Sequence, residues 1–200
     1  MQIILRVKWT PEQYVAEQCQ HRMKRPDFCP HCQQRALRAL GYYKRWLSGL
    51  TQEPLRISVR RFKCKLCRLT VSLLPWFAQP YRVVRNKTIE AYFFGISDRE
   101  DVQRWSDPLG CYWRRFTRWL PELREAVGAA FGRAPPTHDH RRWATFVVGI
   151  TGDFAGGTQR LVTERRVTAF GRYRCHSPNP RASTHLIDSE RDKSVKPYAA

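Results

Sequence analysis

The stretches FCPHCQQ (residues 28–34) and FKCKLCRL (residues 62–69) each hold two cysteines separated by two residues. A two-residue gap lets one tight turn deliver two thiolates to the same metal ion, and Zn²⁺ takes four such ligands in a tetrahedron. The two pairs therefore predict one zinc site, with these ligands: Cys29, Cys32, Cys64 and Cys67. Four protein ligands leave no open position, so the expected role of the ion is structural.

Other interpretations of the cysteines stay open. The four thiols could be buried without a metal, and a single C-x-x-C pair could be a redox centre, although no thioredoxin-like strand–helix–strand pattern surrounds either pair. Glycine often follows the second cysteine of such a turn because that position favours positive φ, yet Gln33 and Arg68 stand there. Further candidate ligands are His31, Cys19 and His21, which a complete set of four thiolates does not need.

The segment between the two pairs has the pattern of a β-hairpin. In LRISVRRF (residues 55–62), aliphatic and polar side chains alternate with the period of a half-buried strand. The stretch RALGYYKRWL (residues 38–47) supplies a second run, and GLTQEP (residues 49–54) supplies a turn. We therefore predict a zinc ribbon over residues 28–71, after an N-terminal extension over residues 1–27.

The charge of the chain points to a polyanionic partner. Lys and Arg number 36 against 17 Asp and Glu, a net charge of +19. Between residues 22 and 68, 13 Lys and Arg face two acids, and aromatic residues lie among them. We expect this surface to contact the phosphates of double-stranded DNA, through Lys44, Arg45, Arg56, Arg60, Arg61, Lys63 and Lys65. A solvated face that only keeps the domain soluble is the alternative.

Residues 85–132 have helical periodicity, after an extended connector over residues 72–84. Ser97 and Glu100 have the spacing of a capping box, and Pro121 is expected to end or kink the helix that begins near residue 106. Short helices followed by an arginine-rich helix outline a helix-turn-helix, whose last helix reads DNA. Its candidate DNA contacts are Tyr112, Arg114, Arg115 and Arg118. A helical bundle with a charged outer face is the alternative.

The same segments resemble a known family. CPHC with ALGYYKRWL, LRISVRRFKCKLC, TVSLLPWFAQPYR and YWRRFTRWL are similar to the zinc-ribbon plus helix-turn-helix modules of bacterial transposases and transposon-associated proteins. The resemblance covers residues 28–131. It implies DNA binding within a mobile element, at transposon ends, with a separate transposase as a partner.

Catalysis is not expected. Transposases that cut DNA hold two metal ions with three carboxylates on a mixed α/β domain, whereas only 68 residues follow Gly132. FVVGITGDF (residues 146–154) could be a first catalytic strand with Asp153 as its acid, but no second and third strand with acids follow. Residues 133–200 are predicted to be a linker and a poorly structured basic tail. His138 and His140 lie in that linker.

The location expected for this chain is the bacterial cytoplasm, at the nucleoid. MQIILRVKWT (residues 1–10) lacks the pattern of a secretory signal, and WATFVVGI (residues 143–150) is too short to span a bilayer. A reducing compartment also suits unpaired cysteines, of which the chain has an odd total of seven.

Together these features predict an α+β protein: a small β zinc ribbon, then a helical helix-turn-helix domain and an irregular basic tail. The expected function is non-catalytic, sequence-specific DNA binding. The rival functions are a protein–protein adaptor and an RNA-binding ribbon protein that stacks Tyr42, Tyr43 and Trp46 on unpaired bases.

Overall fold

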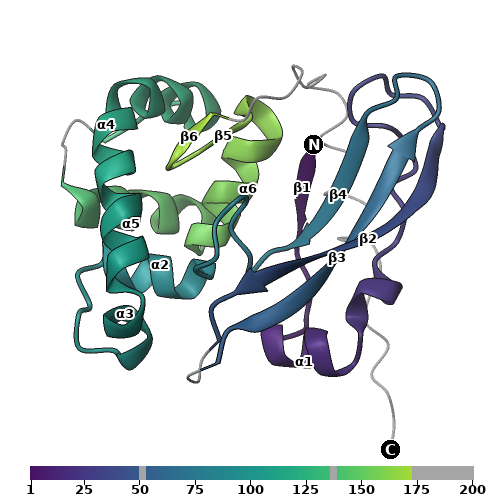
Figure 1. The fold of residues 1–200 in the computed structure, drawn as a ribbon. Helices are drawn as coiled ribbons and strands as arrows, with labels where there is room; N and C mark the ends of the chain where they lie inside the picture. Colours follow the sequence, from purple (N-terminus) through teal and green to yellow (C-terminus); the bar gives the residue numbers. More distant parts are fainter. Residues whose placement is uncertain (50–52, 136–138, 173–200) are drawn as a thin grey trace, which may run out of the picture.

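A four-stranded sheet forms the N-terminal half of the molecule (Figure 1). The computed structural model describes residues 1–49, 53–135 and 139–172. The sheet has the order β1-β4-β3-β2, and its strands are β1 (Gln2–Leu5), β2 (Leu37–Leu47), β3 (Leu55–Cys64) and β4 (Thr70–Pro75). Strands β2, β3 and β4 are antiparallel in turn, whereas β1 lies parallel to β4. The mixed α+β class and the predicted hairpin are therefore present.

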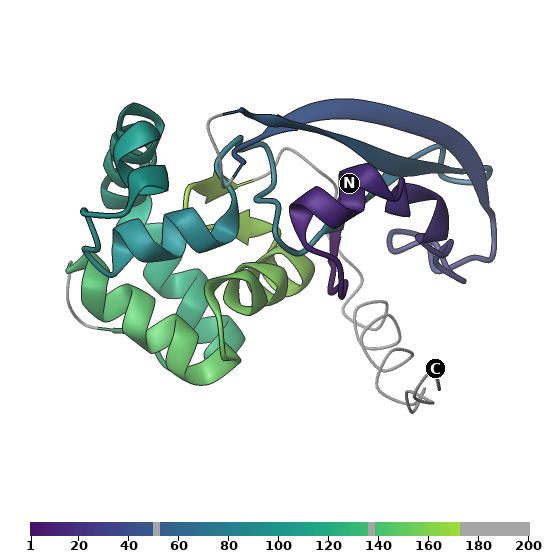
Figure 2. The same ribbon diagram turned by 90° about the horizontal axis from the view of Figure 1, so that it is seen from below.

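The alternation of side chains explains the central strand. Ile57 and Val59 of β3 are fully buried, whereas Arg56 is exposed, as the period-two pattern predicts. The pairing of β2 with β3 shifts register between Ala39 and Gly41, and Gly41 has a φ of +99°. A bulge at a glycine bends and twists a strand, which accounts for the long curved hairpin in Figure 2.

The first 27 residues are part of this core, so the predicted N-terminal extension is wrong. Strand β1 extends the sheet through pairs such as Ile3 with Leu73. Helix α1 (Pro11–Ala16) packs near β3, and the buried Tyr14 donates its hydroxyl hydrogen to the carbonyl of Ser58 at 2.9 Å. A short 3₁₀ helix, η1 (Cys19–Arg22), follows. Contacts between residues far apart in the sequence place this segment against the sheet. An analysis of hydrophobic periodicity cannot detect such contacts.

The predicted connector over residues 72–84 is also wrong in part. Its first residues, up to Pro75, belong to strand β4, where Val71, Leu73 and Leu74 are fully buried. A strand can end in proline because the missing N–H falls at the last ladder position. The remaining residues form the loop from the sheet to the helices.

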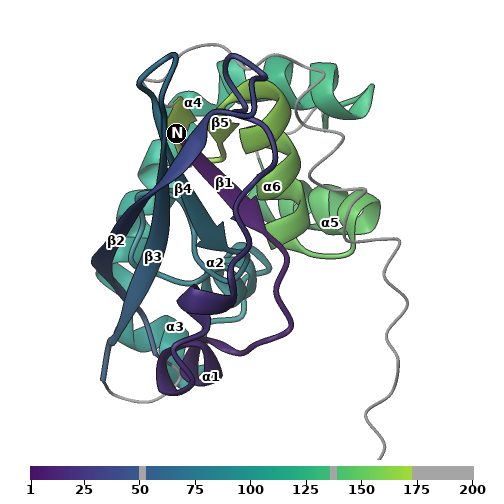
Figure 3. The ribbon, with the colours of Figure 1, turned by 90° about the vertical axis from the view of Figure 1, so that its right-hand side faces the viewer.

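Helices form the C-terminal half, beside the sheet (Figure 3). They are α2 (Asn86–Phe93), α3 (Glu100–Arg104), α4 (Ser106–Phe131), α5 (His140–Thr151) and α6 (Phe154–Arg165). A small hairpin of β5 (Val167–Thr168) and β6 (Gly171–Arg172) closes the described chain. Helix α4 supplies a buried stripe at three- and four-residue steps: Leu109, Tyr112, Phe116, Leu120, Leu123, Val127 and Ala130.

Two local predictions in this half need correction: the helix does not end at Pro121, and the capping box does not form. Helix α4 continues through Pro121, which is exposed, so the hydrogen bond that proline removes lies on the solvent side while Leu120 and Leu123 stay buried. Helix α3 begins after Arg99 without a side-chain cap, so Ser97 and Glu100 form no capping box there. Packing of the apolar face outweighs the local end signals in both cases.

Residues 139–172 are more ordered than the composition of the chain predicts. Residues 143–150 lie in helix α5, where Trp143, Ala144 and Val147 are buried on one face, and they form no strand. Asp153, the candidate first catalytic acid, is the N-cap of α6 and accepts a hydrogen bond from the N–H of Gly156. His138 and the predicted tail from residue 173 onward lie outside the described residues.

A buried ionic network joins the two halves. Arg85, at the start of α2, lies 3.6 Å from Asp101 of α3 and 3.7 Å from Glu12 of α1. The Asp101 carboxylate also accepts hydrogen bonds from the hydroxyl of Thr88 at 2.5 Å and from Arg99 at 2.8 Å. Burial would raise the pKa of Asp101, but these hydrogen bonds and the nearby arginines outweigh it and lower that pKa below its usual value.

We predict that Asp101→Asn lowers the free energy of unfolding by at most about 3–5 kcal/mol at neutral pH, because the buried Arg85 then keeps only the partly exposed Glu12 as a counter-charge. A carboxylate whose pKa falls on folding stabilises the protein above its unfolded pKa of about 3.9 and loses that effect as the pH drops through its folded pKa. The difference between the two proteins should therefore shrink below about pH 4. Urea unfolding followed by circular dichroism measures both.

The matched control for this test is Asp98→Asn, at an exposed position three residues away. It should unfold like the wild type at every pH. A loss as large as that of Asp101→Asn would contradict a specific role for the buried network.

Candidate metal centre and basic sheet surface

Four cysteine side chains meet at one end of the β2–β3 hairpin. The Sγ atoms of Cys29 and Cys67 lie 3.6 Å apart, as do those of Cys32 and Cys64, and all four Sγ atoms lie within 4.8 Å of one another. Cys29 and Cys64 are buried, and the other two are half-buried. The predicted set of four thiols is therefore brought together as one candidate metal site.

Local backbone geometry explains how each C-x-x-C turn forms. In the first turn the N–H of Gln33 donates to the carbonyl of Cys29 at 2.8 Å, and in the second the N–H of Cys64 donates to the carbonyl of Leu69 at 2.9 Å. Gln33 and Arg68 have φ values of +58° and +63°. The two positions where glycine usually stands thus adopt the left-handed conformation without glycine, at a cost in backbone strain.

The two turns are also joined by the backbone. The N–H of Lys65, in the second turn, donates to the carbonyl of Ala36, which precedes β2, at 2.8 Å. Because Cys64 is the last residue of β3 and Leu37 the first of β2, the sulfur cluster lies where the paired strands start and finish. A metal ion there would join the start of β2 to the end of β3.

Two of the sulfur–sulfur distances match the spacing that a tetrahedral ion requires. Metal–sulfur bonds of about 2.3 Å place tetrahedral sulfurs about 3.8 Å apart, close to the observed 3.6 Å pairs. Burial raises the pKa of the Cys29 thiol to about 12. Burial acts in the same direction on Cys64, but the N–H groups of Cys67 and Leu66 outweigh it and lower the Cys64 pKa to about 7. The lowered pKa thus favours the thiolate form of Cys64.

The other candidate ligands are not part of the cluster: His31 stands in the first cysteine turn, and Cys19 and His21 lie elsewhere. Across the residues that the structure describes, the group of metal-binding side chains contains the four cysteines alone. The Sγ atom of Cys19 contacts the carbonyl of Gln13, and the ring of His21 lies against Tyr42 with centroids 5.1 Å apart.

The basic residues predicted on the sheet divide into two groups. Lys44, Arg56 and Lys65 are exposed, and Lys63 is half-exposed. Arg45, Arg60 and Arg61 instead donate to backbone carbonyls: Arg45 to Gln79 and Arg82, Arg60 to His21 and Met23, and Arg61 to Tyr42. Arg45 and Arg60 thus hold neighbouring segments against the sheet, whereas Arg61 binds the adjacent strand β2. The sequence offers no signal for these roles.

Aromatic side chains lie beside the exposed cations. The register places Trp46 opposite Arg56 and Tyr42 opposite Arg60, and each guanidinium lies over the ring of its partner, at 5.7 Å and 6.0 Å from the centroid. Tyr43 points to the other face, where its hydroxyl accepts a hydrogen bond from the side-chain amide of Gln2 at 3.2 Å. Strands β2 and β3 together carry seven Lys and Arg and no Asp or Glu.

On helix α4, three of the four predicted DNA contacts are accessible. Arg114, Arg115 and Arg118 are exposed. Tyr112 is buried, with 8% of its surface exposed, and its hydroxyl accepts a hydrogen bond from the N–H of Val83 at 3.2 Å. The prediction for Tyr112 is therefore wrong, because its position falls on the apolar stripe of the helix.

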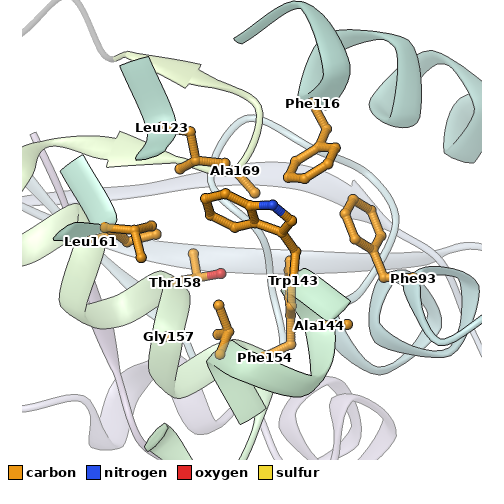
Figure 4. A pocket seen from close by; sticks show the side chains of 12 residues that line it. Phe93, Phe116, Leu123, Trp143, Ala144, Phe154, Gly157, Thr158, Leu161 and Ala169 are labelled. Carbon is orange, nitrogen blue, oxygen red and sulfur yellow. The ribbon is translucent and has the colours of Figure 1, made fainter. Parts of the chain in front are cut away.

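A small cavity inside the helical half lacks acid–base groups. Figure 4 shows the Trp143 indole surrounded by apolar side chains such as Phe93, Phe116 and Leu161. Thr158 provides the one hydroxyl group among the residues that line the cavity, and no Asp, Glu, His or Lys is among them. Imperfect packing between helices accounts for this space.

In the described residues, no helix is both long and apolar enough to cross a membrane.

We predict that Cys64→Ser lowers the bound metal from about one equivalent to near zero and unfolds the cysteine turns, because three thiolates no longer close a tetrahedral site. Metal analysis by mass spectrometry and thermal unfolding measure these effects. Cys111→Ser, at an exposed position on α4, is the control and should keep both metal and stability. Full metal content in Cys64→Ser would contradict a four-thiolate site.

Comparison with known families gives one match. Residues 29–106 are similar to a domain of unknown function, DUF6431. The matched segment starts at the first cysteine of the cluster and ends where helix α4 begins, so it holds the whole candidate metal centre and the β2–β3 hairpin. Comparisons with curated proteins and with solved structures give no match.

Proposed function

We propose that this chain is a zinc-stabilised, non-catalytic protein that binds double-stranded DNA. The observation that carries the proposal is the position of the four-cysteine cluster at the end of a hairpin whose strands hold seven basic residues and no acid. A rigid, cationic, acid-free surface is what a phosphate backbone requires of its partner.

Zinc is the metal that the ligand set favours. Four thiolates in a tetrahedral arrangement suit Zn²⁺, and two C-x-x-C turns at the end of antiparallel strands are typical of a zinc ribbon. The closed ligand set supports a structural ion whose binding energy adds to folding.

The exposed cations of the hairpin supply the DNA contacts in this proposal. In the described part of the chain, Lys44, Arg56 and Lys65 form no ion pair with a carboxylate. Their charges therefore remain available to phosphates, which confer affinity and register without sequence choice.

Helix α4 offers a second cationic surface. Arg114, Arg115 and Arg118 lie on its exposed side, and residues 108–121 contain no acid. The preceding helices α2 and α3 are short, which supports reading this half as a helix-turn-helix with α4 in the major groove. In this model arginines of α4 reach guanine edges and add sequence preference.

The biological setting that we propose follows the resemblance to transposase modules. A protein with a ribbon and a DNA-reading helix, but without a nuclease domain, would act as an accessory factor. It would bind transposon ends in the bacterial nucleoid and cooperate with a separate transposase.

We predict that Lys44→Ala with Lys65→Ala weakens duplex binding. The negative slope of log K against log salt concentration should become shallower by about 2, because each lysine that contacts a phosphate releases about one counterion. Fluorescence anisotropy with a labelled duplex at several salt concentrations measures the slope.

The control for this pair is Lys8→Ala with Lys87→Ala, which removes the same charge from exposed positions outside the hairpin. If both double variants bind equally, the hairpin is not the phosphate-contacting surface.

We further predict that Arg114→Ala with Arg115→Ala weakens binding to a selected site more than binding to random duplex. Each lost arginine–guanine contact costs about 1–3 kcal/mol of discrimination. The site is first selected from a random duplex library, and the two affinities are then compared by gel-shift competition. Equal losses for both DNAs would argue against α4 as a recognition helix.

A further inference from the structure

We propose that the exposed aromatic side chains of strand β2, Trp46 and Tyr42, form a stacking platform for unpaired bases of DNA. This inference rests on the proposed DNA binding and adds the kind of DNA that the hairpin contacts. The platform face is defined here as Tyr42, Lys44 and Trp46 of β2 with Arg56 and Arg60 of β3.

Trp46 is the strongest element of the platform face. Its residue surface is 53% exposed, although tryptophan is usually highly buried in folded proteins. The Arg56 guanidinium lies 5.7 Å from the centre of the indole, directly across the strand pair. The contact holds the ring beside a cation without burying it, and an indole held in this way offers a π-face to a base and a charge to the adjoining phosphate.

Tyr42, four residues before Trp46, repeats the arrangement on the same face. Its residue surface is 38% exposed, and its ring lies 6.0 Å from the guanidinium of Arg60. The Tyr42 hydroxyl shares a hydrogen bond of 3.1 Å with Nδ1 of His21. Arg60 donates to the carbonyl of His21 in η1 and to the carbonyl of Met23, which follows η1. Tyr42 is therefore held in place before any ligand binds, which reduces the entropy lost on binding.

The order of residues on the face matches a single strand. Lys44 lies between the two aromatics, and the four-residue separation along a strand spans about 13 Å. That distance corresponds to about four nucleotides at the 3.4 Å spacing of stacked bases. Two stacking positions with a lysine between them would thus contact bases at both ends and phosphate in the middle.

The platform face lies along the edge strand of the sheet, where Trp46 and Tyr42 are exposed. Strand β2 pairs with β3 alone, so it is the outermost strand. Its Arg38, Lys44 and Arg45 disfavour the addition of another protein strand, because basic side chains at an edge resist strand pairing. The same charges attract a polyanion. Charge complementarity therefore favours nucleic acid over a second copy of the chain.

The test uses the full chain with zinc bound and three labelled DNA probes: a short single strand, the same strand with abasic residues, and the duplex. The wild type should bind the base-bearing strand about ten-fold or more tightly than the abasic strand, because each stacked base contributes about 1–3 kcal/mol. Trp46→Leu should remove most of this preference, whereas Trp46→Phe, which keeps an aromatic ring, should retain part of it. Binding to the duplex should change little in either variant.

Tryptophan fluorescence gives a second readout that does not depend on affinity. Base stacking on Trp46 quenches its emission, so saturation with the single strand should quench the wild type more than Trp46→Phe. Metal content and circular dichroism of both variants should equal those of the wild type, because Trp46 is more than half exposed.

The outcomes separate the two proposals. An unchanged preference for bases in Trp46→Leu would overturn the stacking platform and leave duplex binding intact. A wild type that binds none of the three probes at low ionic strength would overturn the proposed function as well. Tighter binding to an RNA strand of the same sequence would overturn the assignment to DNA.

Discussion

The convergence of four sulfur atoms is the constraint on which the rest of the N-terminal half depends. Residues 24–36, which carry the first cysteine pair, contain neither helix nor strand. The segment is held by hydrogen bonds within its own turn, by the hydrogen bond from Lys65 to Ala36 and by the packing of its cysteines against the second pair. The buried Cys29 and Cys64 lie at that point, and a metal ion there would satisfy all four thiols and cross-link two turns far apart in the sequence.

The hairpin that extends from this cluster uses its arginines in two ways. Arg45, Arg60 and Arg61 are half-buried and donate to backbone carbonyls of neighbouring segments. Arg56 and Lys44 remain exposed beside aromatic rings. The anchored arginines stiffen the sheet, and the exposed cations gain a fixed spacing as a result. A preorganised charged surface binds an extended polyanion with a smaller entropic cost than flexible side chains on a loop.

The helical half is not an independent attachment to this sheet. The buried Arg85 pairs with the buried Asp101 of α3 and with the partly exposed Glu12 of α1. Val162 of α6 packs into the core of the sheet, and Arg6 pairs with Asp153 at 3.0 Å. These contacts join the helical half to the sheet at several points along the chain. In the proposed function, the hairpin and helix α4 present two cationic surfaces to one DNA molecule.

The sequence by itself determined the ligand set, the alternating strand over residues 55–62 and the concentration of charge, because these follow from spacing, from period and from composition. It also predicted the exposed arginines of α4, but it could not show that Tyr42 and Trp46 share a face with Arg60 and Arg56. Register across two strands depends on a bulge at Gly41, and no local pattern specifies it. Tertiary structure alone decided that β1 joins the sheet, that Tyr112 is buried, that α4 passes through Pro121 and that residues 143–150 are helical. In each of these cases the burial of an apolar face against a distant segment outweighs the local signal of the chain.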